Sequence, residues 1–313
     1  MAGRIPSPPP PLTRTITFGD LTWTDIVDPT EESQKYLAEH FSFHPLDLED
    51  ALSRRQLSKT EEYPAYLFVI FHLPVYDKTT QVSTRKQWSA FVGDKFLVTL
   101  RPRELKSTED LFREVESSDD VKQELMGRGS GYLLYSMLDR AIDSYFPVLN
   151  KILSLMDDIE DSVFAEGVEV GKGVSILRRD IITQRRVMFP TRTLFTELEP
   201  KLKRFTRIDL TLFFSDLMDH MNKICDTLDE YDEVIEVYKD ADSVQSNYRA
   251  NSGIRILATL FAIGLPFVIV AGVRMLLPGT IQWNSPAVSY GTLAGVLVLI
   301  LATLIVLRRR HLI

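Results

Sequence analysis

The sequence predicts an α/β domain, a long α-helical segment after it, and two C-terminal helices that cross a membrane. Three observations lead to this class. Strand-like and helical runs alternate up to about position 130. Apolar residues then recur at spacings of three and four, the period of a helix that packs on one face. All 43 Asp and Glu lie before Asn251, and the residues after it hold two long uncharged stretches.

The first part of the chain divides into a tail and an α/β domain. Residues 1–14 are rich in proline, so we expect a disordered tail there. Residues 15–130 contain strand-like runs at 15–27 and 66–76, and a hairpin in which Gly93-Asp94 joins 88–92 to 95–100. Short helices are expected at 31–39 and 45–52.

Residues 131–253 are predicted to form a helical stalk. One apolar stripe runs from 133 to 163, with Pro147 as a possible bend, and a second helix covers 173–198. A third helix begins near Asp209, and nothing between 211 and 266 requires it to stop. If it continues to 277, it is roughly 100 Å long at ~1.5 Å per residue. Such a helix must pack against helices of its own chain and of neighbouring chains.

Two membrane spans are expected at 254–277 and within 287–313, joined by an outer loop at 278–286. Residues 256–273 and 275–307 carry no charge, and a span needs about 20 mostly apolar residues. Three arginines, 308–310, follow the second span, Arg255 begins the first, and the loop has no Lys or Arg. The positive-inside rule therefore places both termini in the cytoplasm. A soluble protein rarely has 33 uncharged residues that end in three arginines, so two buried core helices are disfavoured.

Charge and composition exclude several classes of function. The first 250 residues hold 31 Lys and Arg against 43 Asp and Glu, a net charge of −12. This argues against nucleic-acid binding, and it fits either a domain that attracts cations or an ordinary acidic one. The sequence contains one cysteine, Cys225, and we find no glycine-rich phosphate loop, nucleophile triad or catalytic carboxylate pair. We therefore expect neither an enzyme nor an organic cofactor.

Several short motifs occur in a fixed order along the chain. FHPLDLED lies at 43–50, LLY at 133–135, DSYFPVL at 143–149 and DLMDH at 216–220, and Asn251, Leu257, Pro266 and Ala271-Gly272 follow. In this order, before a terminal membrane hairpin, they closely resemble the CorA metal-ion transporter family over nearly the whole chain. The resemblance implies a homopentamer of the bacterial inner membrane with a funnel-shaped cytoplasmic domain. It also implies passive uptake of Mg²⁺, Co²⁺ or Ni²⁺, or of Zn²⁺ as in the ZntB-like branch, so divalent cations are the expected substrate or regulator.

The resemblance further implies that five copies of the first span line a pore and that the second span faces lipid. Steps of three and four place an apolar set on the pore face: Ile254, Leu257, Ala258, Phe261, Leu265, Val268, Gly272, Met275 and Leu276. A narrow apolar pore is gated by dewetting, and it offers no oxygen to replace the hydration shell of Mg²⁺. An ion would have to cross while still hydrated, or it would not cross at all.

The chain departs from the family at the outer mouth, where the family carries Tyr-Gly-Met-Asn. Arg274 stands in place of the tyrosine, and Met275, Leu276 and Leu277 replace Gly-Met-Asn. The asparagine ring that meets a hydrated cation is therefore absent. Five copies of Arg274 would repel cations, unless each side chain extends to lipid headgroups instead.

Acidic residues in the third helix form a candidate regulatory site. Five of them share one helical face: Asp226, Asp229, Glu233, Glu236 and Asp240. Brought together in a pentamer, they would invite divalent ions, although a solvated face has the same pattern. Two other groups, His40 with His44 and Asp47, and Asp219 with His220 and Cys225, fit a metal by residue type, but a structural role is favoured for both.

Three functions remain open from the sequence. The first is a divalent-cation channel or transporter of altered selectivity. The second is a membrane sensor or regulator that kept the fold and lost conduction. The third, an anion or weakly selective pore, follows from the Arg274 ring and has the least support.

Overall fold

The computed structural model describes residues 12–53, 56–164, 171–276 and 285–309. The chain forms two compact units, Met1–Lys239 and Asp240–Ile313, and each is described by itself. The predicted tail lies outside the described residues up to position 11, and the first strand begins at Thr13.

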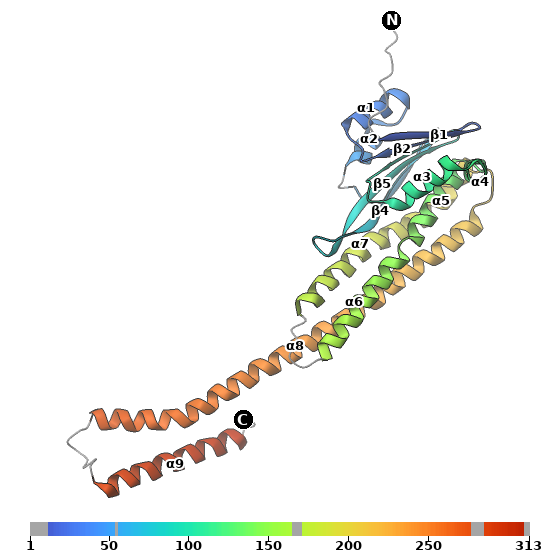
Figure 1. Ribbon diagram of the computed structural model, residues 1–313. Coiled ribbons are helices and arrows are strands. Elements are labelled where there is room, and N and C mark those ends of the chain that lie inside the picture. The colour runs from blue at the N-terminus through green and yellow to red at the C-terminus, as the bar shows by residue number, and fades with distance from the viewer. Residues whose placement is uncertain (1–11, 54–55, 165–170, 277–284, 310–313) are drawn as a thin grey trace. The chain divides into compact units, whose positions relative to one another are not determined.

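The first unit is built on one six-stranded sheet in the order β1-β2-β6-β5-β4-β3 (Figure 1). Only β2 and β6 run parallel among these neighbours. The predicted hairpin is confirmed, because β5 and β6 pair antiparallel from Ser89–Leu100 to Val92–Leu97. The strands are β1 Thr13–Phe18, β2 Leu21–Val27, β3 Lys59–Glu62, β4 Tyr66–Asp77, β5 Val82–Gly93 and β6 Phe96–Arg101.

Helices pack on both faces of this sheet, and apolar side chains are buried on both. The predicted short helices are present as α1 (Glu31–His40) and α2 (Pro45–Leu52), and Leu37 and Leu48 pack with Phe68, Phe91 and other buried residues of one face. The other face meets α7 (Gly171–Leu202), where the Phe71 and Phe195 ring centroids are 6.0 Å apart. Because side chains alternate along β4, its nine buried residues supply both cores.

A buried ion pair joins the two parallel strands. Arg101 of β6 donates to Asp25 of β2 with a 2.9 Å Nη2–Oδ2 distance, and both side chains are at most 1% exposed. Glu109 of α3 (Lys106–Ser117) lies 2.6 Å from Arg101 and 2.6 Å from Arg14. This network ties β1, β2, β6 and α3 together, and the sequence did not reveal it.

The predicted stalk consists of α5, α6, α7 and the first part of α8, as seen beside the sheet in Figure 1. The stripe at 133–163 is two helices, α5 (Ser130–Asp143) and α6 (Phe146–Phe164), instead of one bent helix. Pro147 in the first turn of α6 explains the break, because it has no N–H to donate and its ring would clash with a continuing helix. Tyr231 of α8 (Thr211–Leu276) donates to the Leu149 carbonyl at 3.4 Å, which holds α8 against α6.

Two short elements connect longer ones. The helix α4 (Asp119–Met126) follows α3, and the 3₁₀ turn η1 (Lys203–Phe205) follows α7. Gly129, just before α5, has φ +104°, and a Cβ there would lie 2.7 Å from the Phe205 carbonyl oxygen. Only glycine fits this close approach without strain.

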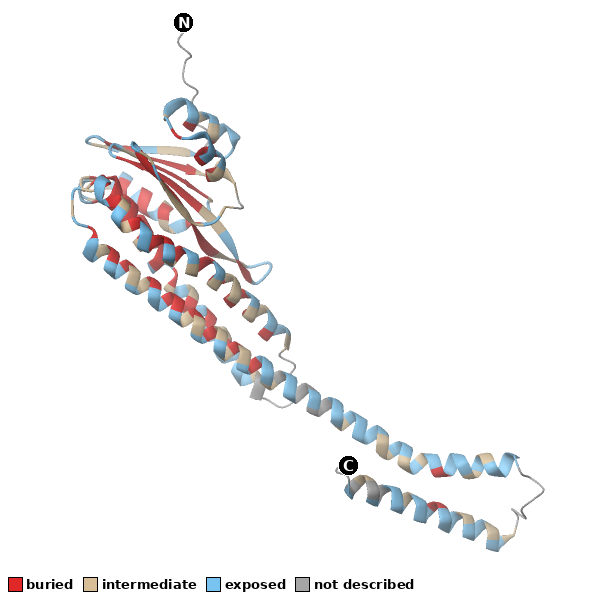
Figure 2. Cartoon of the chain, turned by 180° about the vertical axis from the view of Figure 1, so that it is seen from behind, coloured by how far each residue is buried: buried red, intermediate tan, exposed pale blue. Residues whose placement is uncertain are grey.

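The second unit contains the end of α8 and all of α9 (Pro286–Arg309). Two stretches are long and apolar enough to cross a membrane, Ala250–Leu276 and Pro286–Thr303, and most of their residues are exposed in the single chain, with a minority half-buried (Figure 2). The exposed apolar surface of this unit requires a non-aqueous environment or other chains. Most of the predicted outer loop lies outside the described residues.

Candidate metal site and predicted ion pathway

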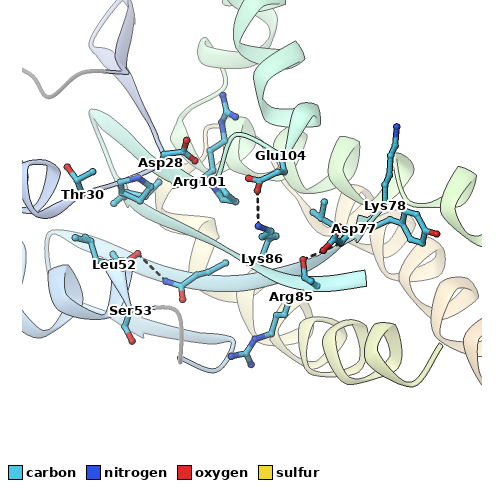
Figure 3. Close-up of a pocket in the computed structure, with 18 residues that line it drawn as sticks. Asp28, Thr30, Leu52, Ser53, Asp77, Lys78, Arg85, Lys86, Arg101 and Glu104 are labelled. Carbon is cyan, nitrogen blue, oxygen red and sulfur yellow. Dashed lines mark hydrogen bonds and ion pairs between the residues drawn. The ribbon is translucent and has the colours of Figure 1, made fainter. Parts of the chain in front are cut away.

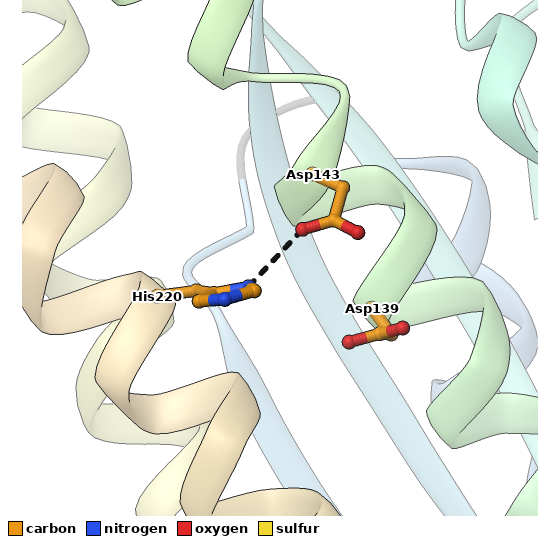
Figure 4. Close-up of side chains that lie close together, drawn as sticks. All are labelled: Asp139, Asp143 and His220. Atoms are coloured by element: carbon orange, nitrogen blue, oxygen red, sulfur yellow. Dashed lines mark ion pairs between the residues drawn. The ribbon is translucent and has the colours of Figure 1, made fainter.

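Three potential metal ligands meet between α5 and α8. Asp139 and Asp143 are four residues apart on α5, so their side chains point from the same face. His220 reaches them from α8, and its Nδ1 lies 3.1 Å from the Asp143 carboxylate (Figure 4). One ligand atom from each of the three residues lies within 4.8 Å of the others. The edge of His220 also packs on Phe146, with ring centroids 5.5 Å apart, which limits where the imidazole can turn.

The electrostatics of this cluster favour a bound cation. Partial burial raises the pKa of Asp139, and the nearby charges of Asp143 and Asp216 raise it further. The protein thus holds carboxylates close together at a cost that a divalent ion would relieve. Two carboxylates and an imidazole suit Mg²⁺ or Mn²⁺ through the oxygens and Zn²⁺ or Co²⁺ through the nitrogen.

Sequence reasoning identified only one member of this cluster. It grouped His220 with Asp219 and Cys225, whereas the structure brings His220 to Asp139 and Asp143 of another helix. Cys225 is fully buried in the helical packing, and burial raises the pKa of its thiol to about 11. One signal in the sequence could have identified the other two ligands. Asp139 and Asp143 are four residues apart in a segment that otherwise carries an apolar stripe.

The predicted acidic face of α8 is partly neutralised within the chain. Asp229 lies 2.5 Å from Arg185 of α7, and Glu236 lies 2.8 Å from Arg178 of the same helix. Asp226, Glu233 and Asp240 are exposed. Two carboxylates of this face thus hold α7 and α8 together, and among the described residues the other three form no ion pair.

The histidines near α2 have structural roles. His44 is the N-cap of α2, where its Nδ1 accepts from the Leu46 N–H at 3.3 Å. Asp47 is buried and accepts from Tyr66 at 2.7 Å and from Tyr63 at 3.0 Å. His40 lies 2.8 Å from the Tyr36 carbonyl. These contacts agree with the structural role that the sequence favours for the three residues, which stays a prediction.

Most of the predicted pore residues are exposed, but Ala258 and Gly272 are half-buried. Leu265 is 55% exposed, Val268 67% and Met275 85%. A different side of α8 carries a stripe of buried Pro266 and half-buried Thr259, Ala262 and Val270. A matching stripe of Val288, Thr292, Val296 and Ile300 occurs on α9, which runs beside α8 in both views. The hairpin contact thus uses the side of α8 away from the predicted pore, and Leu277, predicted at the mouth, lies outside the described residues.

A surface pocket of about 860 Å³ lies in the first unit, between the end of α2 and the long β4–β5 hairpin (Figure 3). Lys86 and Glu104 of its wall lie 2.8 Å apart, and Asp28 of the wall is bound by Arg103, which does not line the pocket.

Comparison with known proteins is consistent with this architecture. A family profile described as "CorA-like Mg2+ transporter protein" matches residues 18–309. YfjQ of Bacillus subtilis (strain 168) is 27% identical over 257 residues, which cover 80% of this chain and 76% of YfjQ. The cobalt/magnesium transport protein CorA of Thermotoga maritima is 25% identical over 256 residues, covering 80% of this chain and 72% of that protein. The complete structure of the CorA magnesium transporter from Methanocaldococcus jannaschii superposes with a TM-score of 0.73 at 20% identity, covering 94% of this chain and 92% of that one.

Proposed function

Because the chain belongs to the CorA-like Mg²⁺ transporter protein family, we propose that it is a divalent-cation channel of altered selectivity, assembled as a homopentamer around its first membrane span. Members of this family are membrane transporters of divalent metal ions and not enzymes. The proposal must still specify which ions pass, which residues line the pore and what controls its opening.

The observation that carries the proposal is the composition of α8. This one helix contains acidic residues that pair with α7 and, further along, an exposed apolar span of 27 residues. A span of that length crosses a bilayer. A helix that is exposed on nearly every side in the single chain requires partners, and copies of itself are the simplest ones.

The wall of the proposed pore is apolar. In a pentamer, Leu257, Phe261, Leu265 and Val268 would each form a ring, with Ile254 and Ala258 on the cytoplasmic side and Gly272, Met275 and Leu276 on the outer side. Rings of this kind expel water when narrow, so the resting pore should be closed by dewetting. Mg²⁺ gives up water reluctantly, and an open pore must therefore pass it hydrated.

The proposed change in ion selectivity follows from the side chains at the outer mouth of the pore. Met275, Leu276 and Leu277 provide no side-chain oxygen, and the sequence has no Asp or Glu beyond Asp242. These three residues therefore cannot select a hydrated ion by side-chain hydrogen bonds to it. Discrimination should be weaker among Mg²⁺, Co²⁺ and Zn²⁺ than in relatives that carry Gly-Met-Asn.

Control of the pore is assigned to bound divalent ions. The cluster of Asp139, Asp143 and His220 is the first candidate, because its ligand atoms already converge. The exposed carboxylates Asp226, Glu233 and Asp240 could join a second site between subunits. In the pentamer we place residues 15–253 in the cytoplasm and 254–313 in a bacterial inner membrane, with both termini cytoplasmic.

Flux into proteoliposomes tests the proposal directly. Mg²⁺, Zn²⁺, Co²⁺ and chloride are compared in parallel under an inward gradient and a negative internal potential, with the full-length protein. Divalent uptake with less than tenfold spread among the three metals is expected. The absence of any divalent uptake would refute conduction, and a metal-dependent stability shift without flux would favour a sensor.

A pair of adjacent variants tests the pore face. Val268→Asn adds a polar ring to the wall, which should weaken dewetting and raise divalent flux by about tenfold, or ~1.4 kcal/mol in the barrier. Phe267→Asn is the control, because Phe267 is adjacent and similarly exposed but lies about 100° around the helix from Val268, beyond the edge of the predicted pore face. Equal effects of the two changes would contradict the assignment of the pore face.

A further inference from the structure

Arg274 carries a charge that its own chain does not balance. The sequence has no Asp or Glu after Asp242, so neither membrane span nor a copy of it can offer a side-chain carboxylate. Asp242 is 32 residues away, about 48 Å along a helix at ~1.5 Å per residue, which exceeds the ~30 Å of bilayer hydrocarbon. A full negative charge opposite Arg274 must therefore come from outside the two spans.

The helix geometry turns Arg274 away from the proposed pore. Successive residues are about 100° apart, so Arg274 lies about 200° from Gly272 and about 120° from Val268 around the axis. Arg274 lies only about 40° from Val270, and Val270 belongs to the half-buried stripe on the side of α8 nearer α9. The side chain itself is exposed. A residue on this side cannot close a ring around the axis that Val268 lines.

Arg274 is also close to the end of the span. The described part of α8 ends at Leu276, two residues or ~3 Å further along the axis. A guanidinium on a three-carbon stem can extend over that distance while its stem stays in apolar surroundings. Its planar fork then meets phosphate oxygens in pairs.

We propose that Arg274 binds the phosphate of an anionic lipid headgroup beside the α8–α9 hairpin, at the outer end of the first span. This rests on the proposed membrane insertion and pore face. The bound lipid fixes the outer end of α8 where relatives with a tyrosine have a neutral residue. Arg274 is thus a positioning residue for the hairpin and no barrier in the pore.

Thermal unfolding in detergent tests this with lipid as the probe. Full-length wild type, Arg274→Gln and Arg274→Lys are titrated with phosphatidylglycerol, with phosphatidylcholine and with inorganic phosphate. Phosphatidylglycerol should raise Tm for the wild type, and Arg274→Gln should need about tenfold more of it, which is ~1.4 kcal/mol of binding. Arg274→Lys keeps the charge and should keep part of the effect, which also separates lost lipid binding from faulty folding.

The other outcomes each bear on the proposal. An unchanged phosphatidylglycerol response in Arg274→Gln would overturn it. If inorganic phosphate gave the same Arg274-dependent shift at the same concentration, the lipid assignment would be wrong. A tenfold or larger rise of divalent flux in Arg274→Gln would make the residue a pore barrier and would also overturn it. Wild-type protein that shows the lipid response but no flux would refute the proposed channel and leave this inference standing.

Discussion

Replacing Asp139 by asparagine should stabilise the metal-free protein and abolish its response to metal. The substitution keeps the size of the side chain and removes one of the two carboxylate charges that flank His220. Two unit charges at 4.8 Å, the upper limit of the spacing in the cluster, repel by ~1 kcal/mol in water and by ~3 kcal/mol at an effective dielectric constant of 20. Asp139 is only half-buried, so the lower figure applies. A gain of ~1 kcal/mol raises the Tm of a unit of this size by about 2–4 °C.

The pH dependence of this gain follows from the direction of the pKa shift. The pKa of Asp139 is raised above its ordinary value in the folded state, so the folded protein holds this proton at a higher pH than the unfolded chain does. The stability from Asp139 is therefore present in acid and is lost as the pH rises through the raised pKa. The advantage of Asp139→Asn should be full at neutral pH and should vanish as the pH falls toward 4.

Thermal unfolding measured with a chelator and with excess Mg²⁺ provides the assay. An ion at 100 times its Kd stabilises the wild type by ~2.7 kcal/mol, and Asp139→Asn should lose most of that increment. Asp161→Asn is the control, because Asp161 is an exposed carboxylate of α6 outside the cluster. A variant that is less stable than wild type in chelator and still responds fully to Mg²⁺ would show that Asp139 has only a structural role.

Three further predictions concern the first unit. Asp25→Asn leaves Arg101 buried without its full charge partner and should cost about 3–5 kcal/mol, measured by urea unfolding; a cost below 1 kcal/mol would contradict this. The guanidinium of Arg14 lowers the pKa of Glu109 to about 2. The stability from this pair should therefore be present above pH ~4.5 and be lost as the pH falls toward 2. Glu109→Gln should flatten that part of the acid-unfolding curve. Gly129→Ala meets both a positive φ and a near carbonyl, and it should lower stability by about 1–3 kcal/mol, whereas an unchanged Tm would show that the loop relaxes freely.

The sequence predicted those features that depend on local pattern. The uncharged stretches predicted the two long apolar helices near the C-terminus, and Gly93-Asp94 predicted the hairpin between β5 and β6. The run at 66–71 was correctly read as buried, because a strand covered on both faces is apolar throughout. These signals lie within a few residues of one another, so no knowledge of the fold is needed to find them.

Features that join distant segments were missed. The pairing of Asp25 with Arg101 spans 76 residues and depends on the parallel register of β2 and β6. The meeting of Asp139 with His220 likewise depends on how α5 packs against α8, which side-chain spacing within one helix does not specify. The break at Pro147 was seen only as a bend, since proline in a first turn and proline within a helix look alike in sequence.

Cys225 offers a practical advantage for studying the ion pathway. It is the only thiol in the chain, it has no exposed surface, and with a pKa near 11 it stays protonated at neutral pH. Alkylating reagents attack the thiolate, so the natural protein should remain unlabelled while folded. Cysteines introduced one at a time along the apolar span can thus be scanned with membrane-impermeant maleimides against a silent background, without first removing a native residue.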